Sequence, residues 1–174
     1  MAETYEADLR AARSIAEIGG IVRGVARELT RADGATFVLR DGNFCFYADE
    51  DAIGPLWKGQ RFPMTECISG WAMLNRDSVE VPDIEQDDRI PLSAYRPTFV
   101  RSLIMTPIGR ERPVGAIGAY WSRTGRQHPS RLAALQELAA AAAAAIERVG
   151  LDDAPWAPNF RVPGASVRPD PSVA

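Results

Sequence analysis

The stretch VRSLIMTPIGRERPVGAIGAYW, residues 100–121, decides the fold of this chain. It holds two runs rich in strand-forming residues, Arg101–Ile108 and Val114–Ser122, joined by a Gly-Arg-Glu-Arg-Pro turn. Two such runs around a short glycine-containing connection are typical of a β-hairpin. This stretch therefore predicts a pair of neighbouring antiparallel strands.

A second hairpin is predicted upstream, in GATFVLRDGNFCFYA at residues 34–48. Asp41-Gly42 is a strong hairpin signal, because both residues tolerate the positive φ of a tight turn. We expect strands at Ala35–Arg40 and Asn43–Ala48. With two hairpins, the sheet should be mostly antiparallel.

Helices are predicted at both ends of these hairpins. One apolar stripe predicts a single helix over Thr4–Arg31, interrupted by three glycines that indicate a kink or another backbone packed closely there. A second helix starts at Pro129 and ends at Gly150. Helices packed on an antiparallel sheet define an α+β architecture. The glycines are Gly19, Gly20 and Gly24.

The remaining segments are shorter. TECISGWAML predicts a helix over Cys67–Asn75, and SVEVP at residues 78–82 predicts a short strand that either ends at Pro82 or lies at an edge of the sheet. The polar connection at Asp83–Phe99 has room for one helical turn. Residues 151–174 hold five prolines and no apolar periodicity, so we expect one domain over 1–150 and a disordered tail over 151–174.

Composition excludes several classes of protein. The chain has 174 residues, with 20 basic and 23 acidic residues and a net charge of −3. It lacks the basic excess of a nucleic-acid-binding domain. We expect no signal peptide at its start, and it has no run of 18 strongly apolar residues that could cross a membrane. Two cysteines are too few for a disulfide scaffold. We expect a cytoplasmic protein with no nucleic-acid or membrane partner.

Cys67 is the one candidate nucleophile with an interesting setting, at a helix start. It needs a base, and the only histidine, His128, lies far along the chain. Cys67 also shares the apolar helix face with Trp71, which favours packing. Ser69-Gly70 lacks the first glycine of a nucleophile elbow, and Cys45 between two phenylalanines is interpreted as a small hydrophobe. We therefore predict no catalytic residue.

The sequence contains no complete metal-binding or phosphate-binding motif. DIEQDD at residues 83–88 alternates acids as a calcium loop does, but Asp88 stands where the turn needs glycine and Ala94 where the site needs glutamate. GAIGAYW at residues 115–121 lies within a strand and does not open a helix. Its small residues leave room above the sheet, which either a ligand or a packed helix can fill.

The segment AYRPTFVR, residues 94–101, is the candidate ligand site. It combines Tyr95 and Phe99 with Arg96 beside a long loop. Aromatic side chains with a few polar groups are typical of small-molecule pockets. The alternative is a loop that two aromatic side chains pin over the core.

Taken together, CISGWAMLNRDSVEVPDIEQDDRIPLSAYRPTFVRSLIMTPIGRERPVGAIGAYW resembles a GAF domain of the kind found next to bacterial sensor histidine kinases. The order of SGWAML, VPDI, an acidic D-x-R stretch, SLIMTPI and PVGAIGAYW carries the resemblance, which covers Tyr5–Val149. It implies a central antiparallel sheet of five or six strands with helices on both sides. It also implies a pocket between the sheet and the Asp83–Val100 connection.

The resemblance also excludes some classes of ligand. Bilin-binding relatives attach their chromophore to a cysteine in the connection, and Asp83–Val100 has none. Cyclic-nucleotide-binding relatives carry acids where this chain has Leu103-Ile104. The ligand and any cofactor stay unidentified. The expected ligand-binding residues are Trp71, Tyr95, Arg96, Phe99 and Tyr120, with Arg96 available to an anionic group.

The resulting prediction is a non-enzymatic sensory or regulatory module that binds a small ligand or a signalling protein partner in bacterial signal transduction. The alternative is a thiol-dependent enzyme of the free methionine sulfoxide reductase type centred on Cys67, although such relatives use several cysteines around the pocket. We also predict a homodimer through the terminal helices, unless the alanines serve only helix propensity. The expected seam is Leu135, Leu138, Ala142, Ala145 and Val149.

Overall fold

A computed structural model describes residues 2–151, with side chains from Thr4 onward. The predicted tail at 151–174 lies outside the described residues except for Leu151. The elements follow one another as α1 (Ala2–Ala11), α2 (Ile15–Thr30), β1 (Gly34–Asp41), β2 (Phe44–Ala52), β3 (Arg61–Pro63), the turn η1 (Met64–Glu66), α3 (Ile68–Asn75), β4 (Val79–Val81), the turn η2 (Ile84–Gln86), α4 (Leu92–Tyr95), β5 (Ser102–Ile108), β6 (Gly115–Trp121) and α5 (Pro129–Val149).

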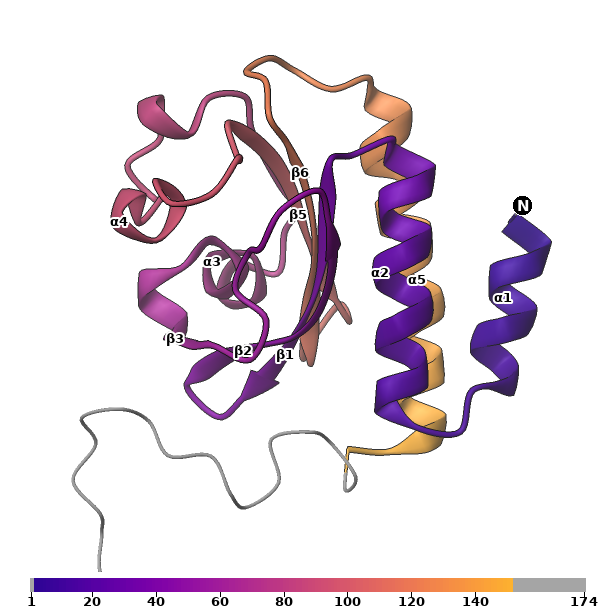
Figure 1. Ribbon diagram of the computed structural model, residues 1–174. Coiled ribbons are helices and arrows are strands. Elements are labelled where there is room, and N and C mark those ends of the chain that lie inside the picture. Colours follow the sequence, from indigo (N-terminus) through magenta and orange to yellow (C-terminus); the bar gives the residue numbers. More distant parts are fainter. Residues whose placement is uncertain (1, 152–174) are drawn as a thin grey trace, which may run out of the picture.

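The six strands form one antiparallel sheet in the order β3-β2-β1-β6-β5-β4. Both predicted hairpins are confirmed, as β1–β2 and β5–β6. They join through β1 and β6, where Gly34 pairs with Tyr120 and Leu39 with Gly115. β4 is the predicted edge strand, while β3 lies in a segment that we expected to be loop. Figure 1 shows the sheet between two layers of helices.

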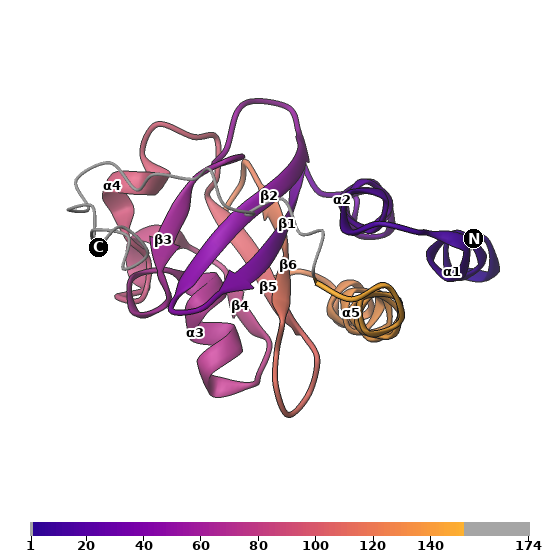
Figure 2. The same ribbon diagram turned by 90° about the horizontal axis from the view of Figure 1, so that it is seen from below.

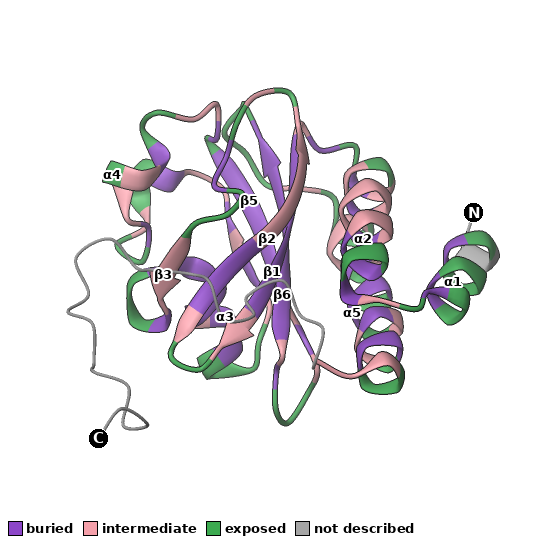
Figure 3. Cartoon of the chain, turned by 60° about the horizontal axis from the view of Figure 1, so that its bottom comes forward, coloured by how far each residue is buried: buried purple, intermediate pink, exposed green. Residues whose placement is uncertain are grey.

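One face of the sheet is covered by α2 and α5, with α1 outside them (Figures 1 and 2). Their apolar sides point inward, as the burial colours in Figure 3 show. The prediction of a single helix over Thr4–Arg31 is wrong, because α1 ends at Ala11 and α2 begins at Ile15. Ser14 caps α2 by accepting a hydrogen bond from the Glu17 N–H at 3.1 Å.

The glycines of α2 differ in what they face. A Cβ added at Gly19 would lie 2.7 Å from the Phe37 ring, so glycine lets α2 lie directly against β1. Nothing lies within 4 Å of a Cβ built on Gly20 or Gly24. The predicted close approach of another backbone is therefore wrong, because the one close neighbour of these three glycines is the Phe37 side chain at Gly19.

The predicted dimer seam on α5 is used within the chain. Leu135, Leu138, Ala142 and Ala145 are buried in the core that α5 shares with α2 and the sheet. Because a covered stripe cannot also meet a second chain, these four residues do not form the predicted seam, and the fifth, Val149, is half-buried. The exposed side of α5 carries Ala133, Glu137, Ala140 and Ala144 instead.

The opposite face of the sheet carries a second apolar core, formed with α3, α4 and the loops around them. The predicted helix at Cys67–Asn75 is confirmed as α3, with Cys67 as its N-cap. The small size of Gly70 serves the contact between η1 and α3. A Cβ there would lie 1.9 Å from the Met64 carbonyl oxygen, so glycine lets η1 fold back onto α3.

Candidate ligand site

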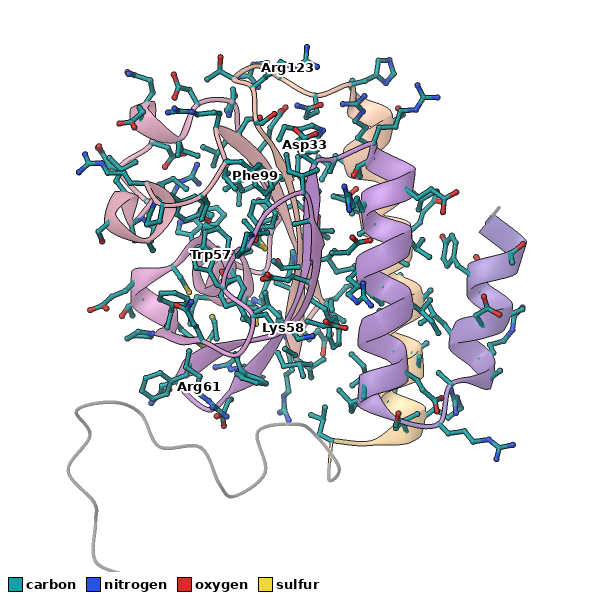
Figure 4. The ribbon with its side chains drawn as sticks, in the orientation of Figure 1. Asp33, Trp57, Lys58, Arg61, Phe99 and Arg123 are labelled. Carbon is teal, nitrogen blue, oxygen red and sulfur yellow. The ribbon has the colours of Figure 1, made fainter. Side chains whose placement is uncertain are left out.

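The candidate site lies on this second face, and Trp57 is at its centre. Trp57 belongs to the loop between β2 and β3, and Glu50 holds that loop in place. The Glu50 carboxylate accepts hydrogen bonds from the backbone N–H groups of Leu56, Trp57 and Lys58, at 3.0, 2.9 and 2.8 Å. These bonds fix the indole between the sheet and the connection that carries α4 (Figure 4).

Three tyrosines surround the Trp57 ring. The Tyr95 ring is 4.6 Å away between centroids, and the Tyr47 and Tyr120 rings are each 5.5 Å away in edge-on contacts. The indole Nε1–H donates to the Ala94 carbonyl at 3.0 Å. Because Tyr47 and Tyr120 stand on the sheet and Tyr95 on α4, this aromatic layer closes the space beneath the connection.

The five predicted ligand-binding residues are brought together only in part. Tyr95 and Tyr120 are both buried in the aromatic layer. Phe99 is half-buried near the start of β1, where its ring would lie 2.9 Å from a Cβ on Gly34. Trp71 is half-buried with the Arg89 guanidinium 4.6 Å above its ring, and Arg96 is exposed. Trp57 and Tyr47 were missed.

The missed aromatics left weak signals in the sequence. Cys45 and Tyr47 are two positions apart in β2, so their side chains point to the same face of the sheet. Trp57 is a large aromatic residue inside an otherwise turn-prone loop, where a buried anchor is the physical reason for such a residue. Neither pattern says which partner covers the side chain.

A chain of polar groups runs beneath the aromatic layer. The Thr36 and Tyr120 hydroxyls are 2.8 Å apart, and the Tyr47 hydroxyl lies 3.1 Å from Ser69 Oγ. Burial is the largest cause that raises the pKa of Tyr47, Tyr95 and Tyr120, so all three phenols are protonated and able to donate. The site can therefore recognise an acceptor.

Unlike the Tyr47 and Tyr120 hydroxyls, the Tyr95 hydroxyl takes no part in these hydrogen bonds. It is buried, yet it has no hydrogen-bond partner within the described residues. Burial is the largest cause that raises its pKa, and Tyr120 and Cys67 raise it further. An unpaired buried hydroxyl costs about 1–3 kcal/mol, so this group is the one place in the layer where a bound molecule would gain most.

Cys67 closes the polar chain at the start of α3. Its Sγ lies 3.3 Å from Ser69 Oγ and accepts from the Gly70 N–H at 3.4 Å. The Cys45 side chain is the main cause that lowers the pKa of Cys67 to about 7, against the opposing effect of burial. His128 caps α5 by accepting from the Ser130 N–H. It is engaged there rather than with Cys67.

A hollow of about 490 Å³ lies outside the aromatic layer, between the β2–β3 loop and α4. Trp57 and Ala94, which are joined by the indole hydrogen bond, both line it, so the hollow borders the aromatic layer. Within residues 2–151, no three histidine, cysteine, aspartate or glutamate side chains gather as a metal ion would require. The hollow is lined by Pro55, Leu56, Trp57, Gln60, Phe62, Ser93, Ala94, Pro97 and Thr98.

An antiparallel six-stranded sheet, with two helices on one face and an aromatic layer under a long connection on the other, defines a small α+β domain. The chain belongs to the GAF domain family, whose pattern it matches over residues 12–147. A search of curated protein sequences gave no match. None of the helices in the described part of the chain is long and apolar enough to span a membrane.

Solved structures agree on the fold. The GAF domain of a phosphoenolpyruvate-protein phosphotransferase from Coxiella burnetii has a TM-score of 0.74 at 15% identity, over 84% of this chain and 90% of that one. The corresponding Acinetobacter domain has a TM-score of 0.73 at 12% identity, over 84% and 90%. The free methionine-R-sulfoxide reductase from Neisseria meningitidis, solved with its substrate, has a TM-score of 0.73 at 19% identity, over 85% and 87%.

Proposed function

We propose that this GAF domain is a non-enzymatic sensory module that binds a small ligand between the sheet and the 83–100 connection. The observation that carries the proposal is the Tyr95 hydroxyl, which is buried in the aromatic layer without a hydrogen-bond partner among the described residues. A ligand with an acceptor group would satisfy this hydroxyl and stack on the surrounding rings.

The aromatic layer also limits what the ligand can be. Flat molecules with few polar atoms suit walls made of Trp57, Tyr47 and Tyr120, whose rings supply apolar faces. Among the residues predicted from sequence, Phe99 lies at the edge of this layer and Arg96 is free on the surface to meet an anionic group. Trp71 is a peripheral contact in this proposal.

Binding requires Trp57 to move, because the indole fills the centre of the layer. Its restraints are the Ala94 carbonyl and the loop that Glu50 orders. The loop and Ala94 lie outside the sheet, whereas Glu50 stands on β2 and anchors the loop to it. Ligand entry would therefore change the β2–β3 loop and α4, which provides a surface signal that a partner protein can read.

Native mass spectrometry of the purified chain, with an absorbance spectrum, tests this proposal. We expect the wild type to retain a co-purified small molecule, and we expect Tyr95→Phe to bind that molecule more weakly. A bare protein mass, together with no thermal shift across a panel of small aromatic metabolites, would contradict it. Arg110→Ala, on the turn between β5 and β6, is the matched control and should bind as the wild type does.

The second candidate is a thiol-dependent enzyme of the free methionine sulfoxide reductase type centred on Cys67. It is supported by the contact of Cys67 with Cys45 and by the pKa of about 7, since an attacking thiolate is needed. Thioredoxin-dependent reduction of free methionine sulfoxide, followed by NADPH consumption, separates the candidates. Turnover that is lost in Cys67→Ser would favour the enzyme.

We further propose that the chain pairs as a homodimer through its terminal helices and acts in the cytoplasm, where two free thiols stay reduced. Support for the interface comes from the exposed alanines Ala140 and Ala144, which line a hollow of about 520 Å³ with α1. Light scattering after gel filtration should give a dimer mass that Ala144→Glu reduces to a monomer. Ala133→Glu, outside the hollow, should leave it unchanged.

A further inference from the structure

Two cysteines that are far apart in the sequence meet at the corner between β2 and α3. Cys45 pairs with Phe62 in the β2–β3 ladder, and the chain then turns back at η1. The Met64 N–H donates to the Asn43 carbonyl at 2.9 Å, which holds η1 over the start of β2. Gly70 lets the same residue, Met64, pack against α3. Cys67 is thereby delivered to the face on which Cys45 lies.

The two thiols belong to one buried cluster with Ser69 and Tyr47. Cys45 and Cys67 are packed in the same buried core and each shifts the pKa of the other, while Cys67 Sγ lies 3.3 Å from Ser69 Oγ and Ser69 Oγ lies 3.1 Å from the Tyr47 hydroxyl. Both cysteines are free thiols in the structure. Neither the ligand proposal nor the packing of α3 requires a pair of thiols in contact.

The cluster gives the two thiols different characters. Cys67 is 6% exposed and Cys45 is 0% exposed, so a small oxidant reaches Cys67 first. Cys67 also sits at the N-terminus of α3, where the Gly70 N–H points at its sulfur. The Cys67 side chain is the largest cause that raises the pKa of Cys45, and Cys45 therefore stays a protonated thiol.

We propose that Cys45 and Cys67 form a redox-active dithiol site that closes to an intramolecular disulfide when a peroxide oxidises Cys67. This inference does not rest on the proposed ligand and needs no methionine sulfoxide as oxidant. It makes Cys67 the reacting sulfur and Cys45 the resolving one.

The reaction balances in two steps. The Cys67 thiolate attacks one oxygen of the peroxide, the O–O bond breaks, and Cys67 becomes a sulfenic acid while the other oxygen takes a proton and leaves as water or an alcohol. The Cys45 sulfur then attacks the sulfenic sulfur. The S–S bond forms, the S–O bond breaks, and the Cys45 proton leaves with the hydroxyl group as water.

Disulfide formation would also alter the cluster. The Cys67 sulfur would turn from Ser69 and the Gly70 N–H towards Cys45, so α3 would lose its capping contact. Ser69 would keep Tyr47 as its remaining side-chain partner. Because Tyr47 stands against Trp57, the redox state would reach the aromatic layer through three neighbouring residues.

Hydrogen peroxide added to the reduced full-length chain tests the proposal. After denaturation and alkylation, intact mass spectrometry should show both thiols blocked together, with two hydrogens lost and no oxygen gained. Peptide mapping should join the Cys45 and Cys67 peptides, and dithiothreitol should restore two free thiols. The rate should rise about tenfold between about pH 6 and about pH 8, as the Cys67 thiolate forms.

Matched variants assign the roles. Cys45→Ser should stop at a sulfenic acid on Cys67, which dimedone traps, and Cys67→Ser should leave Cys45 unreactive. If Cys45→Ser does not fold, Cys45→Ala and the wild-type peptide map decide the question. Two thiols that stay alkylable, a link between two chains, oxygen gained on Cys67 beside a free Cys45, or closure only with methionine sulfoxide would each overturn the proposal.

Discussion

Replacing Tyr95 by phenylalanine removes one oxygen atom and leaves the ring contacts of the aromatic layer in place. In the ligand-free chain this hydroxyl is buried and unpaired. A buried hydroxyl without a partner costs about 1–3 kcal/mol. We therefore expect Tyr95→Phe to raise the free energy of unfolding by about 1 kcal/mol, since part of that cost returns when the oxygen is removed.

The comparison with Tyr47→Phe gives the prediction its control. The chemical change is identical and the ring is equally buried, but the Tyr47 hydroxyl lies 3.1 Å from Ser69 Oγ. Removing it deletes a buried hydrogen bond, so we expect the free energy of unfolding to fall by about 1 kcal/mol. The two variants should move in opposite directions.

Urea denaturation followed by circular dichroism measures both changes, on protein freed of ligand by refolding. The midpoint should shift without a change in slope, and thermal midpoints should move by about 2–4 °C in each direction. A Tyr95→Phe variant that is less stable than the wild type would refute the reasoning, because the hydroxyl would then have a partner. With ligand present the sign should reverse, since Tyr95→Phe would lose the bond that the ligand makes.

Two further predictions concern the framework. Gly70→Ala should destabilise the chain by about 3 kcal/mol or more, because its Cβ would lie 1.9 Å from a backbone oxygen, whereas Gly20→Ala in open helix should stabilise it by up to about 1 kcal/mol; equal urea midpoints would contradict this. Burial raises the pKa of Asp49, but hydrogen bonds from Lys58 and Arg23 outweigh it and hold that pKa below 3.8. Its contribution is therefore complete above about pH 4 and is lost as the pH falls further, so the wild type should lose more stability than Asp49→Asn between about pH 5 and about pH 3.

Local patterns in the sequence determined most of the secondary structure. Asp41-Gly42 predicts the β1–β2 turn because turn geometry depends on adjacent residues. Pro129 and Gly150 mark the ends of α5 for the same reason. Even the break between α1 and α2 was available locally, because Ser14 followed by Glu17 is a helix-start pattern that the long apolar stripe obscured.

Tertiary structure alone decided the site. The pairing of β1 with β6 joins segments that are far apart in the chain, and no turn specifies it. Trp57 enters the core because Glu50 binds three N–H groups of its loop, and Cys67 meets Cys45 because η1 folds back over Gly70. Periodicity records which face of an element is apolar, but it does not record which distant element covers that face. That choice depends on packing between segments, and packing places the aromatic layer and the two thiols.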